Sequence, residues 1–232
     1  MLREGIYHAT NPHPKSGAYL FPEQVERHCV KVFIPGLVRS DRAYIGRVVA
    51  TVRAFRDHEA SLTRLRAMED EQRAGAGAPG PPVRLSPVLE WWTENFALVR
   101  DVSIRRYPVH MQSYDGLLRD PVRVVHETVT WLGGGDALRG CQQVKPERRT
   151  FQRTPSTSVE PEVAEVFDEL YEAVDNARRL SPAFLAKLNE TNARLLPRIR
   201  DERARVSADV AARRAKRAAG GHTGRTLGAG RP

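Results

Sequence analysis

The chain has 232 residues, which is enough for one α/β domain with a hydrophobic core. No apolar run reaches the roughly 18 residues that span a bilayer, and the first residues lack the apolar stretch of a signal peptide. Two cysteines, Cys29 and Cys141, exclude a disulfide framework and show no metal-ligand spacing, so we expect a cytoplasmic protein.

The net charge of +9 is unevenly placed along the chain. Residues 198–232 contain ten Lys and Arg against three Asp and Glu, a net charge of +7. The preceding residues contain 27 basic and 25 acidic side chains, a net charge of +2. The high isoelectric point therefore belongs mostly to the C-terminal segment.

Two short β-branched runs in the first quarter of the chain are typical of buried strands. The first covers residues 30–34 and is closed by Pro35 and Gly36, and the second covers residues 48–53. A short helix or turn is expected between them, at residues 41–46. The second strand leads into a helix, predicted for residues 55–73 from apolar side chains at helical spacing.

A Gly- and Pro-rich stretch, residues 74–82, cannot continue this helix and is predicted to be a mobile loop. Ser86-Pro87 then has the pattern of a helix N-terminus, and the helix extends to about residue 101. Its two tryptophans, Trp91 and Trp92, either belong to the core or shape an acceptor site. A third strand is predicted for residues 107–113.

Three further helices are predicted in the second half of the chain. Asp120-Pro121 begins the first, and Glu160-Pro161 begins another that has a strongly apolar face. A polar, Arg-rich connection at residues 144–155 separates these two helices. The last helix spans about residues 182–196.

Strands that alternate with helices predict an α/β fold with a mainly parallel sheet and a helical C-terminal part. We expect residues 1–197 to form this domain and residues 198–232 to be a basic, disordered tail. The three visible strands are few for a sheet that is covered on both faces.

The junction between the second strand and its helix carries the first functional signal. Arg53 ends the strand at the carboxyl edge of the sheet, where α/β proteins bind ligands, and Ser61 follows about two helical turns later. A guanidinium and a hydroxyl so placed favour a phosphate site. The alternative is a solvated arginine or one that pairs with a carboxylate.

The three strand ends together carry an ordered set of motifs. They are Lys31-Val-Phe-Ile-Pro35, then Arg53 with Ser61 eight residues later, then Ser113-Tyr114-Asp115 followed by Asp120-Pro121 and Trp131-Leu132-Gly133. Their order and spacing, over roughly residues 30–175, resemble the sulfotransferase family, whose members use the donor PAPS (3′-phosphoadenosine 5′-phosphosulfate). The resemblance implies a P-loop-NTPase-like three-layer fold, with PAPS as co-substrate and no metal.

The resemblance also implies a role for each matching residue. Arg53 and Ser61 would hold the 3′-phosphate, and Tyr114 would pack near the adenine. Lys31 would lie near the transferred sulfuryl group and stabilise charge on the leaving phosphate. Without the resemblance, Tyr114 is equally well a buried tyrosine bonded to backbone, and Lys31 is a strand-edge lysine that points to water.

One departure from the family pattern concerns the loop that binds the 5′-phosphosulfate. In the family this loop follows a strand and lies well upstream of the residue that matches Arg53. The segment Pro14-Lys15-Ser16-Gly17 has some similarity to it, but Lys15 is 38 residues before Arg53 and no apolar strand precedes it. We therefore expect the chain to begin after that loop, with a family fold that is incomplete at its N-terminus.

A second departure concerns the catalytic base. Phe33 stands where many family members have a His two residues after the Lys, and a phenyl ring cannot take a proton. His58 is expected on the surface and His110 is expected to be packed within its strand, so the base is unnamed. Three arginines of the later connection either add a phosphate contact or form a solvated loop: Arg148, Arg149 and Arg153.

Two functions remain open at this point. The first is a sulfotransferase that transfers a sulfuryl group from PAPS to a hydroxyl or amine of a small-molecule or glycan acceptor. The second is a catalytically inactive scaffold that binds without reaction, its basic tail contacting an anionic partner such as nucleic acid. The tail has no aromatic residues on which bases stack, so nucleic acid is not expected as a partner. The sequence sets neither the acceptor nor the oligomeric state.

Overall fold

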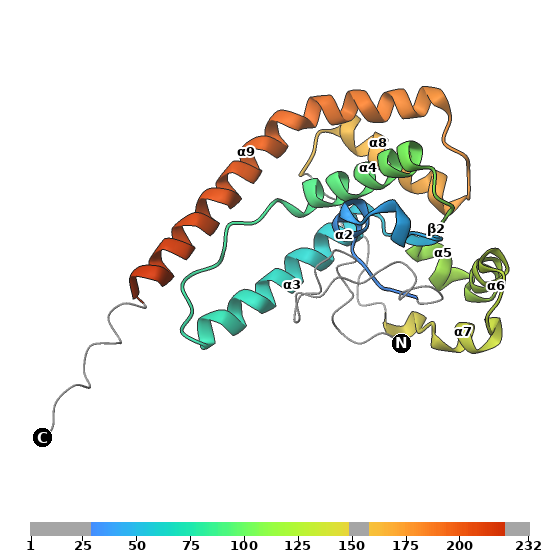
Figure 1. Cartoon of the computed structure of the whole chain (residues 1–232), viewed down its shortest axis with the longest axis horizontal. Helices are drawn as coiled ribbons and strands as arrows, with labels where there is room; N and C mark the ends of the chain where they lie inside the picture. The colour runs from blue at the N-terminus through green and yellow to red at the C-terminus, as the bar shows by residue number, and fades with distance from the viewer. Residues whose placement is uncertain (1–28, 149–157, 221–232) are drawn as a thin grey trace, which may run out of the picture.

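The computed structural model describes residues 29–148 and 158–220, and this part of the chain is mostly helical with two short strands (Figure 1). The strands are β1 (Val48–Val52) and β2 (Val109–Ser113). The helices are α2 (Ile34–Arg39), α3 (Phe55–Gly75), α4 (Pro87–Arg105), α5 (Tyr114–Arg119), α6 (Pro121–Leu132), α7 (Ala137–Gln143), α8 (Pro161–Asp175) and α9 (Pro182–Gly220). Single 3-10 turns lie at Arg42–Tyr44 and Pro146–Arg148.

The two strands form a small parallel sheet, in which Val48 lies opposite Val109 and Val52 lies opposite Ser113. Parallel strands need a crossover connection, and here α3 and α4 supply it. The prediction of a mixed α/β fold with a parallel sheet is therefore confirmed. The full three-layer P-loop-like sheet is not present in the described residues.

The predicted strand at residues 30–34 is wrong. Residues 29–33 have no regular structure, and α2 begins at Ile34 with Pro35 in its first turn. A short apolar run does not by itself distinguish a strand from a buried helical turn. Here Val32 and Ile34 pack against the small cluster of Leu37, Ile45, Leu98 and Tyr107 instead of pairing in a sheet, and the helix begins at the last residue of the run.

Several helix ends follow the local signals in the sequence. Ser86 is the N-cap residue of α4, and Pro87 is its first helical residue. The Asp120 carboxylate accepts the backbone N–H of Arg123 at 3.1 Å and caps α6. Gly133 ends α6 with a φ of 81°, a conformation that favours glycine. The short helices α5 and α7 were not predicted.

The main core lies between α3, α4, α8 and the start of α9. Its centre is aromatic: the rings of Trp92 and Phe167 stack with centroids 4.8 Å apart, and Phe55 meets Phe167 edge-on at 5.4 Å. Trp91 lies 5.0 Å from the same Phe167 ring. Both tryptophans are almost fully buried, so they belong to the core rather than to an acceptor site.

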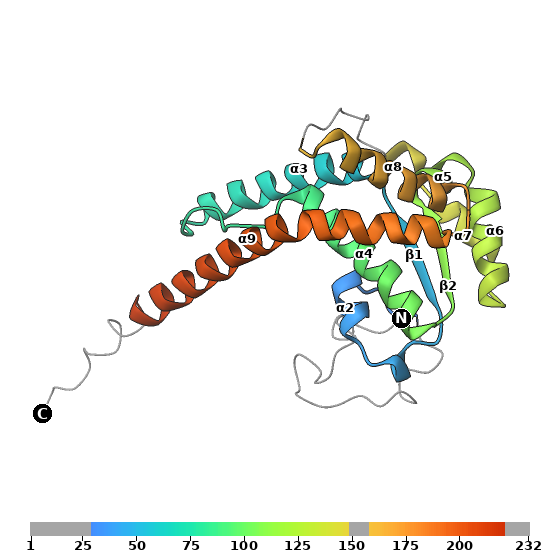
Figure 2. The ribbon, with the colours of Figure 1, turned by 90° about the horizontal axis from the view of Figure 1, so that it is seen from above.

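The last helix is longer than predicted. α9 does not end at about residue 196 but continues through Pro197 to Gly220, so residues 198–220 are helical. Pro197 has no backbone N–H to donate, and α9 bends along its length in both views (Figure 1, Figure 2). The helix continues because Ile199 is buried beyond the proline and Glu202 accepts the backbone N–H of Ser86 at 2.7 Å.

Candidate functional site

The carboxyl edge of the small sheet brings two of the predicted site residues together. Val52 and Ser113 are partners at the ends of the strands, so Arg53 and Tyr114 follow them side by side. The Arg53 guanidinium carbon lies 4.8 Å from the centroid of the Tyr114 ring, within the range of a cation–π interaction. The expected position of Arg53 at the strand end is confirmed.

The other two predicted residues are not part of this pair. Ser61 is half-buried on the second turn of α3, and Lys31 is exposed in the segment before α2. Among the residues that the structure describes, neither side chain forms a hydrogen bond or ion pair with Arg53 or Tyr114. The structure therefore places Ser61 on the helix next to Arg53 and leaves Lys31 outside the pair.

The backbone of Arg53 is held by the aromatic core. The Trp91 indole Nε1–H donates to the Arg53 carbonyl oxygen at 2.7 Å, which satisfies a buried donor and fixes the start of α3. One turn later, Arg56 forms an ion pair with Asp168 of α8 at 2.5 Å. Both contacts anchor the segment that carries the Arg53 guanidinium.

His58 lies close to Arg53 and is not the surface residue that the sequence suggested. Burial, helped by the nearby charges of Arg53 and Arg66, lowers the pKa of its imidazole to about 4. The imidazole is therefore neutral at pH 7 and adds no positive charge to the site. The sequence contains no local signal for this, because α3 buries His58 through contacts with distant segments.

Tyr114 is positioned by a polar network between β2, α5 and α8. The Tyr171 hydroxyl donates to the buried Asp115 carboxylate at 2.6 Å. Ser113 Oγ donates to the Asp175 carboxylate and accepts the backbone N–H of Gly116 at 2.8 Å. Burial raises the pKa of the Tyr171 hydroxyl, and its bond to Asp115 adds to the rise.

The tight packing at Gly116 belongs to the same network. A Cβ atom at Gly116 would lie 2.6 Å from Ser113 Oγ and 3.1 Å from Asp175 Oδ1. Real Cβ contacts are essentially never as short as the first of these distances, so the absence of a side chain at Gly116 permits the network to close. The residues on both sides of Tyr114 are thus held by buried hydrogen bonds.

The remaining predicted candidates lie elsewhere. His110 is half-buried on β2, and its ring centroid lies 5.6 Å from that of Trp131. Phe33, the residue at the expected base position, is 76% exposed. Arg148 lies on the 3-10 turn that ends the first described segment. Three predicted features lie outside the described residues: Arg149, Arg153 and the segment 14–17.

A second titratable group with an unusual environment is Glu94, on α4. Burial raises the pKa of its carboxyl group to about 7, and the charge of Glu90 one turn earlier contributes in the same direction.

No group of three or more metal-ligating side chains is found in the described parts of the chain. Within those parts, no helix has the length and apolarity required to cross a membrane.

Known proteins offer no further guidance on identity. Comparison of the chain with protein-family models, with curated proteins and with solved structures found no match in any of the three.

Proposed function

We propose that this chain binds the 3′-phosphoadenosine part of PAPS at the carboxyl edge of its sheet and acts as a sulfotransferase. The observation that carries the proposal is the Arg53–Tyr114 pair, a cation and an aromatic ring at adjacent ends of parallel strands, 4.8 Å apart. The motif resemblance over residues 30–175 supports the same reading.

The chemistry of the pair suits a phosphorylated nucleoside. A guanidinium binds phosphate oxygens through paired, charge-assisted hydrogen bonds, and the Ser61 hydroxyl on the following helix would add a neutral one. The Tyr114 ring offers an apolar face for adenine. In the transfer step, the bond between sulfur and the 5′-phosphate oxygen breaks and PAP leaves, while a new bond forms to the acceptor oxygen or nitrogen and the acceptor proton passes to solvent.

A second candidate function is binding without transfer. It is favoured by the exposed position of Lys31, which forms no hydrogen bond or ion pair with Arg53 or Tyr114 in the part of the chain that the structure describes. Phe33, two residues later, offers no group that takes a proton. In this case the chain binds the adenosine bisphosphate PAP as well as PAPS and turns over neither.

Calorimetric titration with PAP tests the binding half of the proposal. We expect saturable binding that Arg53→Ala weakens roughly 10- to 100-fold, since a hydrogen bond to a charged group contributes about 1.5–3 kcal/mol. Tyr114→Ala should weaken binding as well, while Tyr114→Phe, which keeps the ring, should not.

The matched control is Arg100→Ala, which removes an exposed arginine on α4 and should leave PAP affinity unchanged. Absence of PAP binding, or equal affinity in the Arg53 and Arg100 variants, contradicts the proposal. A measurement of PAP release from PAPS in the presence of phenols, amines and sugars then distinguishes the transferase from a protein that only binds. Turnover that Lys31→Ala abolishes supports the transferase, and binding without turnover supports the second candidate.

A further inference from the structure

The C-terminal half of α9 is a charged helix that extends away from the sheet and from α4 in both views (Figure 1, Figure 2). One face of this half contacts the rest of the chain. Asp209 accepts the backbone N–H of Val83 at 3.1 Å, and Arg213 donates to the carbonyl oxygens of Gly80 at 2.9 Å and Pro81 at 2.6 Å. These bonds fix which side of the helix faces outward.

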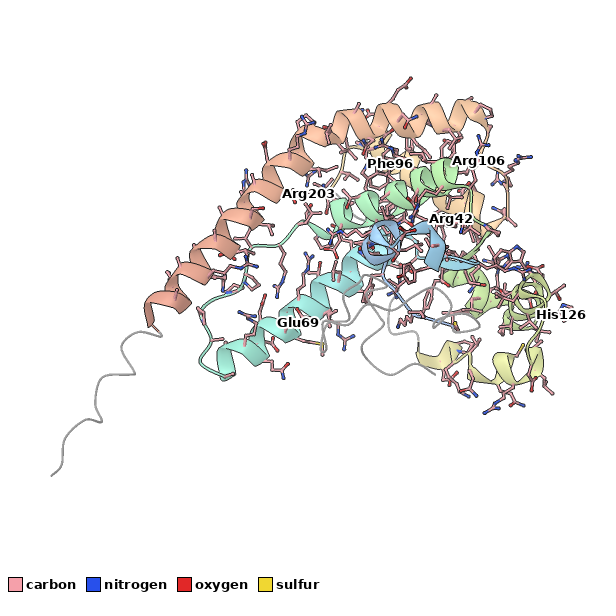
Figure 3. The ribbon with its side chains drawn as sticks, viewed as in Figure 1. Arg42, Glu69, Phe96, Arg106, His126 and Arg203 are labelled. Carbon is pink, nitrogen blue, oxygen red and sulfur yellow. The ribbon has the colours of Figure 1, made fainter. Side chains whose placement is uncertain are left out.

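The acidic side chains on the inward face already form ion pairs with arginines of the same helix. Glu202 pairs with Arg198 at 3.3 Å, and Asp209 pairs with Arg213 at 2.6 Å. The outer surface carries cations that are exposed and that form no ion pair with any described residue: Arg200, Arg203, Arg205, Arg214 and Lys216. Arg203 is labelled on the helix in Figure 3. Between residues 198 and 216, the one exposed acidic side chain among those described is Asp201.

Helical spacing arranges these cations on two flanks. Arg203 and Arg214 are eleven residues apart, about three turns, and so lie on one side of the helix. Arg205 and Lys216 have the same separation and lie on the opposite side. Each pair spans about 17 Å along the axis. The surface between the flanks consists of small residues: Ala204, Ser207, Ala208, Ala211 and Ala215.

We propose that this half of α9 binds double-stranded DNA, with the helix in the major groove and the flanking cations on the phosphates of both strands. The major groove is about 12 Å wide and admits a helix, and small outward side chains permit close approach. Over about 17 Å of its axis the duplex carries about ten phosphate charges. This number exceeds the number of exposed cations on the helix, so the duplex has enough phosphates to pair with all of them.

Two features favour a duplex over other polyanions. Among the described residues after Pro197, Val210 is the one exposed large apolar side chain, whereas a helix that inserts into a membrane surface presents a full apolar face. The segment also lacks aromatic side chains, on which single-stranded bases stack, but a duplex presents no unstacked bases and needs none. The deep and narrow major groove of double-stranded RNA does not admit a helix. The absence of aromatic residues from this segment therefore disfavours single strands and not a duplex.

The test uses the full chain and a fluorescein-labelled DNA duplex of about 20 base pairs, titrated by anisotropy at several salt concentrations. We expect binding whose logarithm falls linearly with the logarithm of salt concentration. The variant Arg203→Ala/Arg205→Ala/Arg214→Ala/Lys216→Ala should bind at least about tenfold more weakly, with a salt slope that is smaller by roughly three to four. Alanine keeps the helix propensity, and circular dichroism checks that the helix remains.

The matched control removes four exposed arginines that lie outside α9 and form no ion pair with a described residue: Arg39, Arg100, Arg139 and Arg179. It has the same net charge as the α9 variant, and we expect it to keep most of the affinity. No duplex binding at low salt, or equal loss in the two variants, overturns the proposal. So does tighter binding to a single strand of the same sequence, or binding to vesicles with anionic lipid when the duplex does not bind.

Discussion

Two titratable side chains on neighbouring helices, His58 and Glu94, are shifted in opposite directions by burial. Burial disfavours whichever form is charged, so it lowers the pKa of the imidazole to about 4 and raises that of the carboxyl group to about 7. Arg53 and Arg66 strengthen the first shift, and Glu90 strengthens the second. Both side chains are thus largely uncharged near pH 6.

Glu94→Gln should make the protein more stable at alkaline pH. Because the folded-state pKa of Glu94 is raised from 4.5 to about 7, its contribution to stability is fully present below about pH 4.5 and is lost as the pH rises through 7. The variant has no charge to bury. At about pH 8 its free energy of unfolding should exceed that of the unmodified chain by on the order of 1–2 kcal/mol.

Urea denaturation at several pH values measures this difference. The advantage of the variant should disappear below about pH 4.5, where Glu94 becomes protonated in both states. What remains in the variant is the effect of His58, whose lowered pKa makes stability rise with pH between about 4 and 6.5. The exposed Glu71→Gln is the control, and an equal effect of both substitutions at pH 8 would contradict the assignment.

Among the elements, α8 has a double role, because it supplies core residues and also closes the end of β2. Phe167 lies in the aromatic centre of the core, one turn before Tyr171. Tyr171 and Asp175 then hold the residues on either side of Tyr114 through Asp115 and Ser113. Small movements of α8 would therefore change the position of Tyr114 relative to Arg53.

Tyr171→Phe tests this coupling between helix and strand end. Loss of the hydroxyl leaves one Asp115 oxygen without its tyrosine donor, which should lower the free energy of unfolding by about 1–3 kcal/mol. A double-mutant cycle with Asp115→Asn should show that the two effects are not additive. Additive losses would mean that the hydrogen bond does not join α8 to the strand end.

At the scale of the whole molecule, α9 packs in the core at its start and binds the loop between α3 and α4 farther along. Its first turns bury Phe184 and Leu188 in the main core. Farther along, Glu202, Asp209 and Arg213 accept from or donate to the backbone of residues 80–86. The helix therefore stabilises a loop that has no secondary structure of its own.

Ile199→Ala tests whether the fold includes α9 beyond Pro197. The side chain of Ile199 is 2% exposed, so its truncation should cost about 2–5 kcal/mol of stability, measured by denaturant unfolding. Val210→Ala is the matched control, because Val210 is 41% exposed on the same helix and its loss should cost less than about 0.5 kcal/mol. Equal and small effects would mean that the helix does not pack against the core beyond the proline.

The sequence by itself determined the features that depend on neighbouring residues. Caps and breakers such as Ser86-Pro87, Asp120 and Gly133 act within one turn, so the helices that they bound were predicted correctly. The position of Arg53 at a strand end followed from the β-branched run before it and the helix after it. Its proximity to Tyr114 did not follow, since the pairing of β1 with β2 that brings the two residues together is a contact between distant segments.

Only the tertiary structure decided the features that depend on distant contacts. The apolar run at residues 30–34 is not a strand because Val32 and Ile34 pack against α4 and α2 begins at Ile34, and His58 is neutral because α3 buries it near two arginines. α9 passes Pro197 because Ile199 and Glu202 have partners far away in the chain. Local propensities differ by about 1 kcal/mol or less per residue, apart from proline, and such packing contacts exceed them.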